Sequence, residues 1–173
     1  MWNEQIIMML LEGIKDTLYM TLTSTLIGYV IGLPMGILLT VTDKDGIHPN
    51  AAVYKVLDVI ANLIRSVPFL ILLIVLIPFT RFLIGRSYGP TATIVPLVIA
   101  AAPYIARMVE SSLKEVDAGV IEAARSMGAS NFTIVTKVML VEARTSLIVG
   151  ATISLGTIFV SYTHLTLPTT SRV

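Results

Sequence analysis

The chain has 173 residues, of which 55% are hydrophobic and only 13% are charged, and its mean hydropathy is +0.85. Soluble domains carry about 25% charged residues, so this composition excludes an ordinary soluble domain and indicates an integral membrane protein. The net charge of +1 does not indicate a nucleic-acid partner, and the lack of cysteine excludes disulfides, thiolate metal sites and cysteine nucleophiles. Because long apolar segments cross lipid as helices, we predict an all-α, polytopic transmembrane helix bundle.

The first membrane span is predicted at residues 17–41, which hold 25 residues without a charge. As a helix this segment is about 37 Å long, enough to cross a bilayer with some tilt. Residues 2–16 mix apolar and charged side chains, so they fit either an interfacial helix that leads into the span or the start of the span itself. They lack the basic region and cleavage site of a signal peptide, and we expect this helix to be retained.

Glycines repeat at intervals of four within this first span, at Gly28, Gly32 and Gly36. Such a repeat leaves a flat strip on one helix face, where the backbone of a neighbouring helix can approach closely. We therefore predict a helix-packing role, with the alternative that glycines are simply tolerated in membrane helices. Pro34 predicts a kink in the same helix.

A second span is predicted at residues 60–79, after a short turn-rich loop. Arg65 and Pro68 place a cation beside a helix-breaking residue. Two interpretations fit this pair: a bend that faces a transport pathway, or a kinked helix end with an anchoring arginine.

The third and fourth spans are predicted at residues 91–108, which contain Pro96 and Pro103, and at residues 146–162. A polar loop over residues 109–144 separates them. Residues 161–173 are rich in threonine and have neither an apolar run nor amphipathic spacing, so we expect a disordered or foreign tail there. The membrane domain is therefore predicted to cover residues 1–160.

The orientation follows from the lysines and arginines in the short loops. If the four spans alternate, one side of the membrane holds eight of these cations: Lys44, Lys55, Arg65, Arg107, Lys114, Arg125, Lys137 and Arg144. The other side holds Lys15, Arg81 and Arg86. This excess predicts a cytoplasmic 109–144 loop and an amino terminus outside.

An amphipathic helix is predicted over residues 117–128 of this loop. Its apolar stripe consists of Val120, Ile121, Ala124 and Met127. Glu122 and Arg125 lie on the other face, at pairing distance.

A sharp corner is predicted after this helix, because Gly128 suits a left-handed helix end and Ser130 suits the cap of the next helix. Small residues at the corner would let it enter a groove on a partner protein. The chemistry fits equally well an amphipathic helix that rests on lipid headgroups.

The segment from Glu122-Ala123-Ala124 through Gly128 to Val138-Met139-Leu140 resembles the cytoplasmic EAA loop of binding-protein-dependent ABC importer permeases. The chain departs from that pattern at Val141, where the family has proline. Three further stretches, at residues 65–69, 77–81 and 101–110, look like those of methionine importer permeases. The resemblance extends from about residue 9 to about residue 158.

The resemblance implies a type I permease with five spans, of which four are present, and the chain is therefore expected to be truncated or chimeric at its end. It implies a multi-pass protein of the bacterial inner membrane that works as a homodimer. Its other partners would be ATPase subunits and an extracytoplasmic substrate-binding lipoprotein, and its substrate would be D- and L-methionine or a related amino acid. The ATPase would contact the residues of the EAA loop, namely Glu122, Ala123, Ala124, Arg125 and Gly128.

Two alternative functions are an intramembrane enzyme and a secondary amino acid transporter driven by an ion gradient. The sequence has no His-Glu-x-x-His, Gly-x-Ser-x-Gly or phosphate-binding Gly-x-x-x-x-Gly-Lys-Ser/Thr pattern, so we predict a transport subunit without catalytic residues, metal or cofactor. A secondary transporter would favour carboxylates deep in the bilayer, whereas the acids here lie near segment ends. The residues that bind substrate are not predicted.

Overall fold

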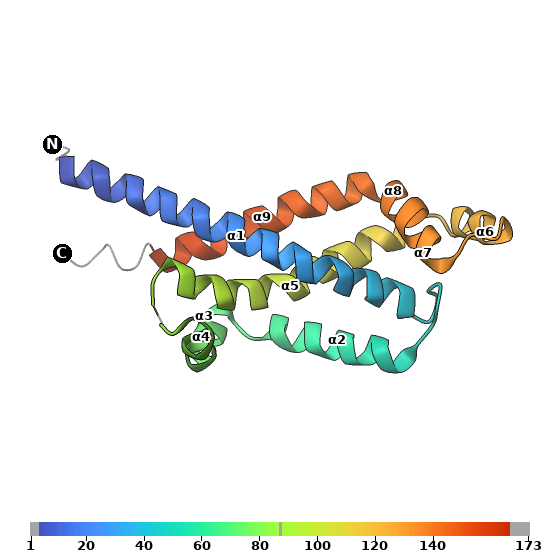
Figure 1. Ribbon diagram of the computed structural model, residues 1–173, viewed down its shortest axis with the longest axis horizontal. Helices are drawn as coiled ribbons and strands as arrows, with labels where there is room; N and C mark the ends of the chain where they lie inside the picture. Colours follow the sequence, from blue (N-terminus) through green and yellow to red (C-terminus); the bar gives the residue numbers. More distant parts are fainter. Residues whose placement is uncertain (1–3, 87, 167–173) are drawn as a thin grey trace.

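The computed structural model of the protein describes residues 4–86 and 88–166, and these form helices joined by turns. Three long helices, α1 (Glu4–Thr42), α5 (Pro90–Lys114) and α9 (Arg144–Thr166), run along the molecule, and α2 (Ala51–Ser66) lies beside α5 (Figure 1). The shorter elements are α3 (Phe69–Val75), α4 (Ile77–Ile84), α6 (Ala118–Ser126), α7 (Asn131–Thr133), the π-helix η1 (Ile134–Met139) and α8 (Leu140–Glu142). Helix α5 is central, because it contacts α1, α2, α3, α4 and α9.

Helix α1 is one continuous helix that begins at Glu4, with Pro34 inside it. The segment before residue 17 is therefore the start of the first long helix and not a separate element. Figure 1 shows that α1 begins near the end of α9 at one end of the molecule, whereas α6 lies at the opposite end.

The glycine strip of α1 faces α5. A Cβ atom added at Gly32 would lie 2.7 Å from the carbonyl oxygen of Ala102, and one at Gly36 would lie 2.6 Å from that of Ala106. The two backbones approach so closely that nothing larger than glycine fits without displacement. This is the close approach that the four-residue spacing predicts.

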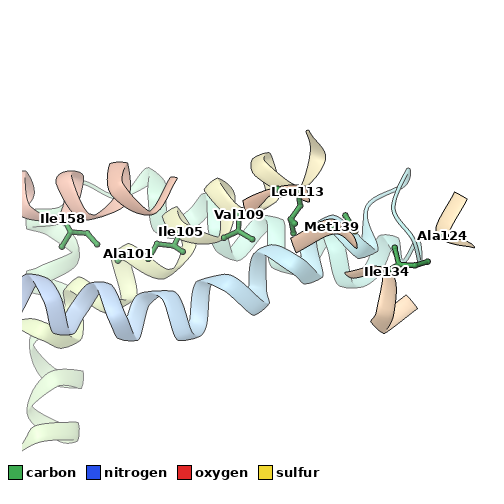
Figure 2. Packing of buried hydrophobic residues seen from close by; sticks show 9 residues of the cluster. Ala101, Ile105, Val109, Leu113, Ala124, Ile134, Met139 and Ile158 are labelled. Carbon is green, nitrogen blue, oxygen red and sulfur yellow. The ribbon is translucent and has the colours of Figure 1, made fainter. Parts of the chain in front are cut away.

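The hydrophobic core follows α5 along its length. Four of its residues recur every fourth position on the face near α1, namely Ala101, Ile105, Val109 and Leu113, and all are buried (Figure 2). Apolar residues of α9, η1 and α6 complete this cluster. Pro96 and Pro103 are buried inside the continuous α5, so this helix with two prolines is enclosed by protein neighbours.

The segment that we predicted as one span over residues 60–79 is divided among α2, α3 and α4. Helix α2 ends at Ser66, and α3 departs from its direction by 103°. The break has a local cause: the ring of Pro68 disfavours the helical conformation for the preceding residue, and Val67 is extended at φ −84° and ψ 124°. A second break follows at Leu76, ahead of Pro78 in the first turn of α4.

The chain after α5 turns through the short elements α6, α7, η1 and α8 into α9. The π-helix η1 gives this connection a wider turn than an α-helix has. Helix α9 continues to Thr166, so residues 161–166 are helical where we predicted a disordered tail. The rest of that tail, residues 167–173, lies outside the described part of the structure.

By length and hydropathy, two helices of the described chain are each able to cross a membrane, Ile7–Thr42 and Pro90–Lys114. The number rises to four if each of two bent pairs counts as one span, α2 with α3 and residues 131–142 with the described part of α9. The four predicted spans agree with the larger number.

Candidate functional site

Helix α6 is defined by polar contacts at both ends. The side chain of Asp117 accepts a hydrogen bond from the backbone amide of Gly119 at 2.7 Å and so caps the helix start. At the other end, Gly128 is left-handed with φ +79°, and the amide of Ala129 donates to the carbonyl of Ala124 at 3.1 Å. Ser130 accepts a hydrogen bond from the amide of Thr133 and caps α7. The predicted helix, corner and second cap are therefore all present.

The apolar stripe predicted for this helix is only half covered. Ala124 is 5% exposed and Ile121 is partly buried, but Val120 is 40% exposed and Met127 is 81% exposed. The sequence pattern predicted an amphipathic helix but not what covers its stripe, and α6 packs mainly against η1, so a single narrow face of it is covered within the chain. Met127 and Val120 remain available as an apolar surface.

The five EAA-loop residues separate into two groups. Glu122, Ala123 and Gly128 are exposed, whereas Ala124 belongs to the buried core beside Ile134 (Figure 2). Ala124 therefore faces the protein itself, which corrects the expectation that it forms part of the surface offered to a partner.

Arg125 is directed toward the loop between α1 and α2. Its guanidinium Nη2 donates to the carbonyl oxygen of Ile47 at 3.0 Å. The expected pair with Glu122 is not among the ion pairs of the described residues. Glu122 is therefore free to meet a cation of another molecule.

A cleft of about 610 Å³ separates α6 from this loop. Charged residues of both signs line it, including Asp45, Lys114, Glu122 and Arg125. The cleft thus adjoins the exposed side of α6 at the same end of the molecule.

An ionic network lies beside this cleft, and the sequence analysis did not find it. Its centre is Glu110, which is 4% exposed. The Glu110 carboxylate accepts hydrogen bonds from Arg107 at 2.7 Å, from Lys114 at 2.8 Å and from the Tyr54 hydroxyl at 3.4 Å. These three donors satisfy the buried Glu110 side chain with hydrogen bonds from two elements, α5 and α2.

The network extends from α5 in two directions. Arg107 pairs with Asp58 of α2 and donates to Asn62 at 3.2 Å, and Lys114 pairs with Asp43 at 2.7 Å. The hydrogen bond from Lys114 holds the pKa of the Asp43 carboxyl below its ordinary value. The only sequence signal was the spacing of Arg107, Glu110 and Lys114, which puts these side chains on one helix face.

The predicted bend at Arg65 and Pro68 borders a groove of about 330 Å³. Apolar side chains of α2, α3, α5, α9 and the bend form most of its wall, and its polar groups include Arg65, Tyr104 and Thr157. The structure therefore brings Arg65 and Pro68 together at an open groove. The described residues contain no group of three or more histidines, aspartates and glutamates arranged to hold a metal ion.

The sequence pattern of one protein family, described as binding-protein-dependent transport system inner membrane component, matches residues 7–171. The chain belongs to this family. It is thus a transport component and not an enzyme, as predicted. As a family member with long apolar helices, it is a multi-pass protein of a bacterial inner membrane.

Curated relatives include the D-methionine transport system permease protein MetI of Salmonella typhimurium and that of Escherichia coli. Each is 49% identical over 156 residues, which cover 90% of this chain and 72% of the relative. A probable permease of the same name from Vibrio cholerae is 43% identical over 154 residues, 89% of this chain and 68% of the relative.

A solved structure of the MetNI methionine ABC transporter, in an inward-facing conformation, superposes with a TM-score of 0.89 at 49% identity. The match covers 91% of this chain and 73% of that chain. A second structure, of an amino acid ABC transporter with histidines, has a TM-score of 0.62 at 21% identity and shares the fold. The family member described here therefore has the predicted type I ABC importer permease fold.

Proposed function

We propose that this chain is the membrane subunit of an ATP-driven importer for D- and L-methionine, and that α6 is the part of it that the ATPase subunit grips. The observation that carries the proposal is the 49% identity over 156 residues to D-methionine permeases. The geometry of α6 supports it, because the helix ends the molecule at one side and exposes Glu122, Ala123 and Met127.

In the proposed mechanism, α6 is the part of the permease that the ATPase moves. ATP binding draws two ATPase subunits together, and a helix seated in a cleft of each is displaced as a rigid unit. The small side chain of Ala123 permits close docking, and the carboxylate of Glu122 is available to a cation of the ATPase. Two copies of the permease then rock between outward and inward access, with substrate delivered by an extracytoplasmic binding lipoprotein. Such coupling requires that the two conformations differ in their affinity for nucleotide.

The groove at Arg65 and Pro68 supports a pathway along the bent helix. Its walls are mainly apolar, and Arg65 supplies a positive charge at its edge. These features suit an amino acid that has an apolar side chain and a carboxylate.

The first experiment tests whether α6 couples the permease to ATP hydrolysis, by reversing a charge on the helix and by adding a bulky side chain at its end. Glu122→Arg and Gly128→Trp should insert normally, yet abolish stimulation of ATP hydrolysis by the loaded binding protein in the assembled complex. Glu12→Arg is the matched control. It reverses the charge of an exposed acid near the start of α1, away from α6, and should leave stimulation intact. Normal stimulation in both α6 variants would refute the role of this helix.

A second experiment tests the orientation. Because the chain has no cysteine, single cysteines at Glu4 and Met127 are unique labelling sites. With the amino terminus outside, an impermeant maleimide added to intact cells should label Glu4→Cys and not Met127→Cys. The reverse pattern would overturn the assignment of α6 to the cytoplasm.

A further inference from the structure

Helix α6 has few supports. Its buried Ala124 packs near Ile134 of η1, and Figure 2 shows these two side chains together at the end of the core. Among the described residues, the hydrogen bond from Arg125 to the Ile47 carbonyl joins this helix to the α1–α2 loop. The position of α6 is therefore set by η1 on one side and by the α1–α2 loop on the other.

The α1–α2 loop is itself a tight structure. The amide of His48 donates to the Val41 carbonyl at 3.0 Å, and that of Asn50 donates to the Thr42 carbonyl at 2.9 Å. Gly46 permits this fold, because a Cβ atom there would clash with the Val41 carbonyl. Asp43 then joins the loop to Lys114 at the end of α5. A force applied to the loop is thus transmitted to α1 and α5.

The ionic network continues from Lys114 to α2. Lys114 contacts Glu110, Glu110 contacts Arg107, and Arg107 pairs with Asp58. Ala61 is the buried residue of α2, so charged contacts account for much of its attachment to α5. Charge-assisted hydrogen bonds are stronger than neutral ones, so these pairs keep the loop and α2 attached to α5 even when distances change slightly.

Helix α2 leads directly into the 103° bend, and the last residues of the helix line the groove of about 330 Å³. A continuous series of contacts therefore connects α6, at the end of the molecule, with the groove at the bend. This series is separate from the backbone connection, in which α6 is joined to the bundle through η1 and α9.

We propose that Arg125, Asp43 and Lys114 are positioning residues that brace α6 against the α1–α2 loop, so that displacement of α6 moves α2 and the groove through the network. The inference rests on the proposed function, in which the ATPase displaces α6. It adds a second connection between that helix and the pathway, and it assigns to Arg125 an internal role in place of a contact with the ATPase.

The brace is tested first in the full chain alone, reconstituted in lipid vesicles. Spin labels on Met127→Cys of α6 and Val59→Cys of α2, both exposed positions, report the distance between the two helices. Arg125→Ala should raise the population of displaced α6 roughly tenfold, as expected for the loss of a hydrogen bond to a charged group. Arg125→Lys, which keeps a cationic donor, should have a smaller effect.

Lys44→Ala is the matched control, because it removes an exposed cation from the same loop without touching the brace. It should leave the distance distribution unchanged. An unchanged distribution in Arg125→Ala would overturn the brace, as would an equal change in Lys44→Ala.

The complex with the ATPase subunit separates failure of the brace from failure of the proposed function. A cysteine at Ile71, an exposed position of α3 beyond the bend, reports whether nucleotide alters the groove side through its rate of maleimide labelling. Nucleotide should change this rate in the otherwise unaltered complex and in Lys44→Ala, but not in Arg125→Ala. If the ATPase subunit co-purifies and the rate still responds in Arg125→Ala, the brace is wrong and the proposed function stands. If no ATPase subunit co-purifies, the proposed function fails, and the vesicle measurement still decides the brace.

Discussion

Helix α5 meets its neighbours α1 and α2 in opposite ways. Against α1 it presents a row of buried apolar residues that meets glycines at the closest possible backbone approach. Against α2 it presents Arg107 and Glu110, which bind side chains of α2 through charge and hydrogen bonds. Close packing acts over a fraction of an ångström and fixes one arrangement, whereas ionic contacts tolerate small changes of distance. The comparison indicates that α1 and α5 move as one unit, and that α2 follows this unit through contacts that permit small changes of distance.

The largest loss of stability is expected from a change in the ionic network, through which α5 contacts α2. Glu110→Ala removes a buried carboxylate that Arg107 and Lys114 share, and these cations keep only their pairs with Asp58 and Asp43. The change should lower the free energy of unfolding by about 3 kcal/mol. Denaturation of the full chain in detergent measures this loss. Glu115→Ala, which removes an exposed acid one turn away, should change it by about 0.5 kcal/mol at most. Equal losses in the two variants would show that the network adds nothing to the attachment of α2.

The next largest loss of stability is expected from a change in the apolar contact between α1 and α5. Gly36→Ala forces a methyl group against the Ala106 carbonyl and the Val109 side chain, and it should cost about 2 kcal/mol by overpacking. The control is Gly13→Ala in the same helix, where a Cβ atom would meet nothing within 4 Å. The control variant should be neutral or slightly more stable, since alanine favours helix. A tolerated alanine at position 36 would mean that α1 and α5 are not rigidly packed.

The smallest expected effect is a dependence of the free energy of unfolding on pH, which comes from the pair of Asp43 and Lys114 in the ionic network. The pKa of Asp43 is lowered in the folded chain by the hydrogen bond from Lys114, so the unfolded chain binds the proton more tightly. The stabilisation is therefore present above the ordinary carboxyl pKa of 3.8 and is lost as pH falls below it, through the folded value. Its size is expected to be about 1 kcal/mol at most. Asp43→Asn should be less stable than the natural chain at pH 7 and equal to it in strong acid, and a constant difference would contradict this assignment.

Local patterns in the sequence predicted local structure well. The four-residue repeat of glycines predicted a face of close helix packing, which the structure places against α5, and Gly128 and Ser130 predicted the corner after α6. In each case the physical cause lies within a short stretch of one or two helices, so nearby residues in the sequence contain the necessary information.

Contacts between distant segments were not predicted. Asp58 and Arg107 are 49 positions apart, and Arg125 and Ile47 are 78 apart, so no spacing rule joins them. The division of the second span was missed for a related reason: hydropathy shows where a segment is apolar, but not how far its axis turns at Pro68. The exposure of Met127 likewise depends on what packs beside α6, which periodicity alone does not specify.

The π-helix η1 has a consequence for how the chain tolerates insertions and deletions. A π-helix closes its hydrogen bonds one residue later than an α-helix, so residues 134–139 contain one residue more than an α-helical turn requires. Removal of one residue there converts the turn to regular α-helix and leaves the faces of α7 and α9 where they are. The same deletion within α5 rotates every later side chain by about 100° and removes the apolar row from α1. Length variation in this part of the chain is therefore expected at η1.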